Sequence, residues 1–500
     1  MILAIDQGTT GTTCIVYDER AQPVARAYRE HRQHFPQPGW VEHDAREIWE
    51  TAHGLALQAL AQAGARPGDL AAIGITNQRE TVCVWDPVSG EPLHRAIVWQ
   101  DRRGAPLCER LRGEGREPLV RERTGLVLDP YFSATKISWL LENVPDLAAR
   151  ARVRARARGA VFGTIDSWLI FKLTGRHLTD ATNASRTLLY DIAAGRWDPE
   201  LLDLFDIPAE SLPEVRPSAG PFATCLPDAL GGYTAASGGR AVPVAGVAGD
   251  QQAALFGQAC LRPGQGKNTY GTGSFVLLNT GSTPPAPTPG LLSTVAWTTD
   301  AGTTYALEGA IFATGAAVQW LRDGLRIIAD ATETQGLAES LQANDGVYFV
   351  PALTGLGSPH WDPHARGTIV GLTRGAGRAH LARATLEAIA YQTVDAVRAM
   401  ESAAGQPLGE LRVDGGASAN AWLMQFQADV LDTPVLLGQT ADSTAFGAAL
   451  LAGVGAGAWG AADVPSLWSE RMRYEPRMSA EERQRLLAGW GQALERARSR

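Results

Sequence analysis

Length, composition and charge place this chain among ordinary globular proteins. Its 500 residues exceed what one hydrophobic core usually supports, so two domains are expected. A hydrophobic share of 45% with 20% charged residues argues against a disordered, collagen-like or coiled-coil chain, and the net charge of -8 argues against nucleic acid as the main partner. The five cysteines form no C-x-x-C pair, which disfavours a disulfide framework or zinc site and favours a cytoplasmic location.

The N-terminal segment predicts a β-hairpin with an acid at its mouth. Residues 2–5 are typical of a buried strand, 8–12 of a Gly/Thr-rich turn and 14–17 of a second strand, with Asp6 where the first strand ends. No basic leader or apolar stretch precedes Asp6, so no signal peptide is expected. An uncharged stretch at 443–462 is rich in Gly and Ala and predicts a packed helix and loop instead of a membrane span.

The rest of the N-terminal half mixes helices and strands. Helical patterns cover residues 45–63 and 133–143, and strands are predicted at 71–76, 81–85 and 95–99. A mixed α/β fold is therefore expected for this half.

A similar order begins again after the Gly-rich segment 243–249, with a Gly/Thr turn at 270–274 and a strand at 275–279. We therefore expect a domain boundary near residue 246, giving domains 1–246 and 247–500. A long helix is predicted within 380–400. A strand at 411–413, the turn Asp414-Gly415-Gly416 and an apolar helix then form the best candidate for the nucleotide side.

Arg79 and Glu80 are the most informative pair of residues, because they place a fixed cation beside a carboxylate just after a predicted strand. A guanidinium donates hydrogen bonds in a rigid fork and a carboxylate only accepts them, so together they can hold neighbouring hydroxyls of a small polyol. A surface ion pair of little energetic value is the alternative.

Two Gly/Thr turns offer backbone N–H groups and hydroxyls to phosphate oxygens, although plain hairpin turns remain an alternative for each. The first contains Thr9, Thr10 and Gly11, and the second contains Thr272. Phosphoryl transfer also needs a base near the acceptor hydroxyl and a divalent cation near the phosphates. Asp250 and Asp6 are the candidates for these two roles, with a helix N-cap as the other interpretation of Asp250.

These motifs resemble the FGGY carbohydrate kinases of the actin/hexokinase/heat-shock ATPase superfamily over nearly the whole chain. The resemblance implies two ribonuclease-H-like domains with a deep cleft between them, and ATP-dependent phosphorylation of a small polyol with Mg²⁺. It is strongest to the family members that phosphorylate glycerol at a terminal hydroxyl. The matching segments are residues 6–10, 38–44, 74–81, 99–103, 129–133, 182–187, 249–252, 268–273 and 414–416.

The resemblance also implies roles for single residues. Asp250 would be the catalytic base that takes the proton of the attacking hydroxyl, and with Asp6 it would lie near Mg²⁺, interacting indirectly or through water. The residues expected to bind glycerol are Arg79, Glu80, Tyr131, Asp250 and Gln251, with Trp99 and Phe275 as an apolar wall. The residues expected to bind ATP or ADP are Thr9, Thr10, Gly11, Thr272, Gly315, Gln319, Gly416 and Asn420.

The chain departs from the family pattern at the first phosphate turn. The family usually has an arginine that reaches the nucleotide phosphates where this chain has Thr13. A loop with Gly238 and Arg240 resembles, in altered form, an allosteric site for fructose 1,6-bisphosphate. The resemblance further implies a homodimer or homotetramer and a functional link to a glycerol channel.

Two other functions remain open from the sequence. One is an FGGY kinase for another polyol or a pentulose, which Arg79 and Glu80 disfavour because relatives similar to xylulokinase carry Met-His-Gly at this place. The other is an ATP-gated binding protein without kinase activity, since fold alone does not determine function. Substrate-stimulated ATP consumption distinguishes the kinases from the binding protein.

Overall fold

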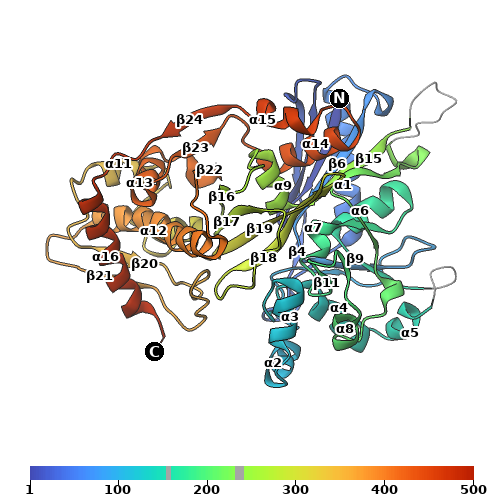
Figure 1. Cartoon of the computed structure of the whole chain (residues 1–500), viewed down its shortest axis with the longest axis horizontal. Coiled ribbons are helices and arrows are strands. Elements are labelled where there is room, and N and C mark those ends of the chain that lie inside the picture. Colours follow the sequence, from blue (N-terminus) through green and yellow to red (C-terminus); the bar gives the residue numbers. More distant parts are fainter. Residues whose placement is uncertain (154–158, 231–240, 500) are drawn as a thin grey trace.

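The computed structural model describes residues 1–153, 159–230 and 241–499. Its elements form a mixed α/β fold of two domains, with two large sheets whose helices lie on either side (Figure 1). The allosteric candidates Gly238 and Arg240 lie outside the described residues.

The first large sheet is built around the N-terminal hairpin. Its order is β14-β15-β6-β1-β2-β3. Strands β1 and β2 are antiparallel with Asp6 opposite Thr13, so the predicted hairpin is confirmed. Strand β6 runs parallel to both β1 and β15, and β14 is antiparallel to β15. The strands are β1 (Ile2–Gln7), β2 (Gly11–Tyr17), β3 (Pro23–Glu30), β6 (Ala72–Asn77), β14 (Ala219–Thr224) and β15 (Pro243–Gly249).

The second large sheet repeats this plan. Its order is β18-β19-β17-β16-β22-β23-β24. Strands β16 and β17 form an antiparallel hairpin around the second Gly/Thr turn, and β22 and β23 continue in parallel, as β6 and β15 do in the first sheet. The strands are β16 (Gln265–Tyr270), β17 (Ser274–Gly281), β18 (Leu292–Thr299), β19 (Gly302–Ile311), β22 (Glu410–Gly415), β23 (Val435–Gly438) and β24 (Glu470–Tyr474).

Smaller sheets complete the strand structure. A five-stranded sheet in the order β4-β5-β8-β7-β9 lies in the N-terminal half and positions the segment that carries Trp99. Its strands are β4 (Gln33–His34), β5 (Glu42–His43), β7 (Val82–Trp85), β8 (Ala96–Ile97) and β9 (Val161–Thr164). The two-stranded sheets pair β10 (Leu178–Asp180) with β13 (Glu214–Arg216), β11 (Tyr190–Asp191) with β12 (Arg196–Trp197), and β20 (Tyr348–Val350) with β21 (Thr368–Val370).

The longer helices follow the apolar periodicity of the sequence. Helices α1 (Ala45–Gln62), α4 (Ser133–Asn143) and α12 (Arg378–Ala404) confirm the predicted helices. Asp44 begins α1, because its carboxylate accepts a hydrogen bond from the amide of Arg46. The other α-helices are α2 (Ala105–Gly113), α3 (Glu117–Thr124), α5 (Leu147–Ala151), α6 (Ile165–Thr174), α7 (Ala181–Ala184), α8 (Pro199–Leu204), α9 (Asp250–Gly257), α10 (Gly315–Gln319), α11 (Glu333–Glu339), α13 (Ala421–Leu431), α14 (Ser443–Gly455), α15 (Val464–Leu467) and α16 (Ala480–Ala497).

Separate apolar cores support the two large sheets. One gathers β1, β2 and β6 with α1 and α6, and another gathers the second sheet with α12, α13 and α16. A further cluster joins the two sheets through α9 and α14, and α14 packs against β6 and β15 although it lies late in the chain. In the described part of the chain, no helix has both the length and the apolar character needed to cross a membrane.

Candidate active site

The loop between β6 and β7 holds Arg79 and Glu80 in the interior of the molecule. Their side chains are 2% and 1% exposed, with Arg79 Nε 3.8 Å from Glu80 Oε1. The surface ion-pair alternative is therefore wrong. Glu80 adopts a left-handed backbone with φ of 61°, a conformation that costs free energy for a residue with a side chain and often occurs at functional sites. The hydroxyl of Ser133 donates to the Glu80 carbonyl at 3.1 Å and helps to hold this conformation.

Asp250 meets this loop from the end of β15. It is the first residue of α9, and Gly249 occupies the N-cap position, so Asp250 is not the N-cap residue. Its Oδ1 lies 3.1 Å from Arg79 Nε and accepts a hydrogen bond from the Gln251 amide at 2.7 Å. A Cβ at Gly249 would lie 2.7 Å from carbons of the Arg79 side chain, so glycine permits this approach. The side chain of Asp250 remains 30% exposed.

Burial raises the pKa of Asp250, while the Arg79 guanidinium and the Gln251 amide oppose that shift. Raising the pKa of a carboxylate strengthens it as a proton acceptor, which suits a general base. Asp250 is thus the partly open carboxylate beside a covered arginine.

Glu308 and Arg186 complete the charged cluster, and the sequence analysis assigned no role to either residue. Glu308, on β19, accepts hydrogen bonds from Arg79 Nη1 at 2.5 Å and from Arg186 Nη2 at 2.9 Å. Arg186 Nε also donates to Glu80 Oε1 at 2.7 Å. The three side chains are almost fully buried. The two guanidinium groups hold the pKa of Glu308 at about 2 against the opposing effect of burial.

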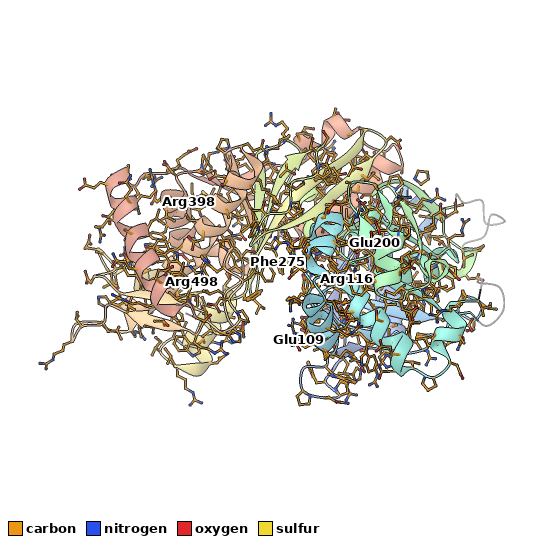
Figure 2. The ribbon with its side chains drawn as sticks, turned by 60° about the horizontal axis from the view of Figure 1, so that its bottom comes forward. Glu109, Arg116, Glu200, Phe275, Arg398 and Arg498 are labelled. Carbon is orange, nitrogen blue, oxygen red and sulfur yellow. The ribbon has the colours of Figure 1, made fainter. Side chains whose placement is uncertain are left out.

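Aromatic side chains line the same region. The rings of Trp99 and Tyr131 meet edge to face with centroids 5.4 Å apart, and the Trp99 indole donates to the Thr9 hydroxyl at 2.9 Å. The centroid of the Phe275 ring, on β17, lies 5.9 Å from the Arg79 guanidinium carbon. It stands between the two halves of the molecule, with Glu109, Arg116 and Glu200 on one side and Arg398 and Arg498 on the other (Figure 2).

Lys267, on β16, is another buried cation that the sequence analysis passed over. It is 0% exposed and donates hydrogen bonds to Gln251 Oε1 and, at 2.9 Å, to Thr269 Oγ1. Gln251 was expected to bind the substrate, and the structure places its amide oxygen against this ammonium group.

The first Gly/Thr turn lies beside carboxylates. The Gly8 amide donates to the Gly11 carbonyl at 2.9 Å, which closes the turn around Thr9 and Thr10. Burial and the nearby carboxylates of Asp250 and Asp442 raise the pKa of Asp6 to about 8. Such crowding of acidic groups favours a divalent cation. The described residues contain no group of three His, Cys, Asp or Glu side chains able to hold a metal ion.

The second Gly/Thr turn opens onto a pocket of about 400 Å³. Thr272, Gly315, Gln319, Gly416 and Asn420 all line this pocket, so the structure brings together the residues expected on the nucleotide side of the second domain. Apolar side chains of Val318, Leu386 and Leu423 add surfaces suited to a planar base. Thr9, Thr10 and Gly11 belong to the first turn and are not among its lining residues.

Asn420 also has a local structural role. Its Oδ1 accepts a hydrogen bond from the Leu423 amide at 3.0 Å and so caps α13, and its Nδ2 donates to Thr334 at 3.2 Å. The side chain is therefore held in place at the wall of the pocket.

Comparison with known proteins identifies the family. The N-terminal domain of the FGGY family of carbohydrate kinases matches residues 1–257, and the C-terminal domain of the same family matches residues 266–456. The chain belongs to the FGGY family of carbohydrate kinases. The predicted resemblance is therefore confirmed, together with the α/β kinase fold.

Individual FGGY kinases are similar over their whole length. A glycerol kinase of Deinococcus radiodurans is 54% identical over 99% of this chain and 97% of its own. The crystal structure of Plasmodium falciparum glycerol kinase with ADP has a TM-score of 0.93 at 36% identity, covering 100% of this chain and 98% of its own. Xylulose kinase from Rhodospirillum rubrum has a TM-score of 0.86 at 26% identity, covering 99% and 98%.

Proposed function

We propose that this FGGY kinase transfers the γ-phosphate of ATP to a terminal hydroxyl of glycerol, giving sn-glycerol 3-phosphate and ADP as the first step of glycerol catabolism. The observation that carries the proposal is the partly exposed Asp250 carboxylate, 3.1 Å from the covered Arg79 and next to Glu80. Full-length similarity to proteins named glycerol kinase, at 54% and 51% identity for those of Deinococcus radiodurans and Thermotoga maritima, supports glycerol as the acceptor.

In the proposed reaction Asp250 accepts the proton of the attacking hydroxyl as its oxygen forms a bond to the γ-phosphorus. The bond from the γ-phosphorus to the bridging oxygen breaks, and ADP leaves with that electron pair. Arg79, Glu80 and Gln251 hold glycerol by its hydroxyls, and Trp99 and Phe275 cover its carbon chain. Mg²⁺, when bound near Asp6 and Asp250, would supply positive charge to the phosphates.

Nucleotide binding is proposed to involve both Gly/Thr turns. Thr9, Thr10, Gly11 and Thr272 would contact phosphates, and Gly315, Gln319, Gly416 and Asn420 would hold the adenosine side. The shared pocket of the last four residues with Thr272 supports this assignment. The proposed domains, 1–246 and 247–500, would each contribute one turn and could close on the substrates to exclude water.

The remaining expectations concern the setting of the enzyme. We propose a cytoplasmic location, which the unpaired thiols of Cys14, Cys83, Cys108, Cys225 and Cys260 support. A homodimer or homotetramer and a functional link to a glycerol channel stay predictions.

The test is ADP formation from ATP and Mg²⁺ with glycerol, xylulose, ribulose or no acceptor. Among these acceptors, we expect only glycerol to stimulate ADP formation strongly. Asp250→Asn should lower the glycerol-dependent rate by roughly 10²- to 10⁴-fold, the usual contribution of a positioned base. Asp300→Asn, in the exposed turn between β18 and β19, is the matched control and should retain activity. Equal rates of ADP formation with and without glycerol would contradict the proposal. Stimulation by xylulose or ribulose instead of glycerol would show that the acceptor is a pentulose.

A further inference from the structure

Lys267 is buried beside the proposed acceptor site without an ion-pair partner among the described residues. Its ammonium group donates to two neutral acceptors, the amide oxygen of Gln251 and the hydroxyl of Thr269. Burial lowers the pKa of Lys267 to about 8, opposed by the charges of Asp414 and Asp250, so the group is mostly protonated at neutral pH. A protonated lysine can donate hydrogen bonds but cannot accept them.

Because Lys267 can only donate hydrogen bonds, it determines which end of the Gln251 amide faces it. The two ends of a glutamine amide differ only in being an acceptor or a donor, and a neighbouring ammonium group stabilises the orientation that presents oxygen. The Nε2 group is then directed away from Lys267, and within the described residues it has no hydrogen-bond partner. Gln251 directly follows Asp250, whose Oδ1 accepts its backbone amide at 2.7 Å.

We propose that Lys267 is a positioning residue that orients the Gln251 amide so that its N–H group, and not its oxygen, faces the acceptor substrate. This inference rests on the proposed function of the site. A hydroxyl oxygen that accepts a hydrogen bond from Gln251 keeps its own proton free for another acceptor. The neighbouring carboxylate of Asp250 is such an acceptor, so the orientation of the amide favours a hydroxyl proton that points to the base.

The proposal predicts that Lys267 acts through Gln251, which a double-mutant cycle measures. Lys267→Met should lower kcat/KM for glycerol by roughly 5- to 100-fold, the range expected when a buried polar group loses its partner. In the Gln251→Ala background the same substitution should change kcat/KM by about twofold or less, because the amide it orients is gone. An equal loss in both backgrounds would overturn the proposal.

Two further variants separate orientation from simple packing. Thr269→Val removes the other hydrogen bond of Lys267 and keeps the contact with Gln251. We therefore expect kcat/KM for glycerol to stay within about threefold of the parent, a smaller change than the loss of one hydrogen bond to a charged group usually causes. Gln251→Glu keeps an oxygen against Lys267 but offers only acceptors to the substrate. It should therefore raise the KM for glycerol and lower kcat, with thermal unfolding showing an intact fold.

Gln251→Glu also keeps the proposal testable if Lys267→Met fails to fold. An unchanged kcat/KM for glycerol in Gln251→Glu would overturn the proposed orientation. Failure of the proposed function gives a different result, since the parent enzyme would then show no glycerol-dependent ADP formation. If the parent enzyme is active with glycerol but the effects of Lys267→Met and Gln251→Ala simply add, the positioning role of Lys267 is rejected and the proposed function still stands.

Discussion

Glu308 receives hydrogen bonds from guanidinium groups that arise from two distant parts of the chain, Arg79 and Arg186. All three side chains are almost fully covered, so each charge depends on the others for the interactions that water would otherwise supply. This cluster contacts Arg79 and Glu80, the residues proposed to bind glycerol, and holds them in place.

Removing Glu308 should therefore destabilise the protein. Glu308→Ala leaves two buried guanidinium groups without their shared carboxylate, and we expect a loss of about 3–5 kcal/mol in the free energy of unfolding, typical of a broken buried pair. Urea unfolding measures the loss. Glu50→Ala, at an exposed position of α1, is the control and should stay within about 0.5 kcal/mol of the parent. A similar value for both variants would show that the cluster is not important for stability.

Glu308 should also make the stability of the protein depend on pH in the acid range. Because the pKa of Glu308 is lowered from 4.5 to about 2 in the folded protein, its charge stabilises the fold above the unfolded pKa, and that contribution is lost as pH falls from about 4.5 toward 2. Glu308→Gln cannot ionise. The difference in unfolding free energy between parent and variant should shrink over this window. A difference that stays constant from pH 6 to pH 3 would contradict the assignment.

Sequence reasoning found the members of the site that lie within short motifs, such as Arg79, Glu80 and Asp250. It assigned no role to Lys267 or Glu308, because each is a single charged residue within a strand and the partners of Glu308 are distant in sequence. A signal did exist for Glu308, since a single carboxylate between buried apolar residues of β19 needs a partner.

At the scale of elements, close packing of backbone on backbone sets the position of Asp250. Helix α14 crosses α9, and a Cβ at Gly447 would overlap the backbone of Ala253. Gly447→Ala should force the two helices apart and displace Asp250, with a destabilisation of about 1–3 kcal/mol from overpacking and reduced turnover. Thermal unfolding and ADP formation report both effects.

Gly491, in α16, is the matched control for this substitution. A Cβ there would meet no atom within 4 Å. Gly491→Ala should stabilise the protein by about 0.5–1 kcal/mol, because alanine favours the helix more than glycine does. If Gly447→Ala behaved like Gly491→Ala, the close contact between α9 and α14 would be wrong.

Long elements with a clear apolar period were predictable, and their contacts were not. The predicted helices at 45–63 and 133–143 agree with α1 and α4 within a residue, and the strand at 71–76 agrees closely with β6. The predicted strand at 95–99 shortens to β8, Ala96–Ile97, because only these two residues pair with β5 in the centre of the five-stranded sheet. The packing of α14 against the first sheet was not predicted, since periodicity identifies an apolar face but not its partner.

At the scale of the whole molecule, the acidic chain must accept an anionic nucleotide. Near the first Gly/Thr turn, burial and the carboxylates of Asp250 and Asp442 raise the pKa of Asp6. Arg26, on β3, lies close enough to lower the pKa of Asp6, and its Nε is 3.1 Å from Asp442. Thr13, at the position of the family arginine, pairs with Tyr28, so side-chain alternation places residue 26 on the same face of the sheet as Thr13.

Arg26 is therefore placed to offset the carboxylates of Asp6 and Asp442 when ATP binds. We expect Arg26→Ala to raise the KM for ATP about three- to tenfold, as for the loss of about 1 kcal/mol of charge interaction, with little change in the KM for glycerol. Arg29→Ala alters an exposed arginine of the same strand whose side chain alternates to the other face, so the KM for ATP should not change. The Arg26 side chain is partly exposed to solvent, so its charge interactions are screened by salt. The increase in the KM for ATP should therefore become smaller as salt is raised from 0.05 to 0.5 M, which shortens the range of charge interactions to a few ångströms. Equal effects of the two substitutions, or an effect on glycerol instead of ATP, would contradict this role for Arg26.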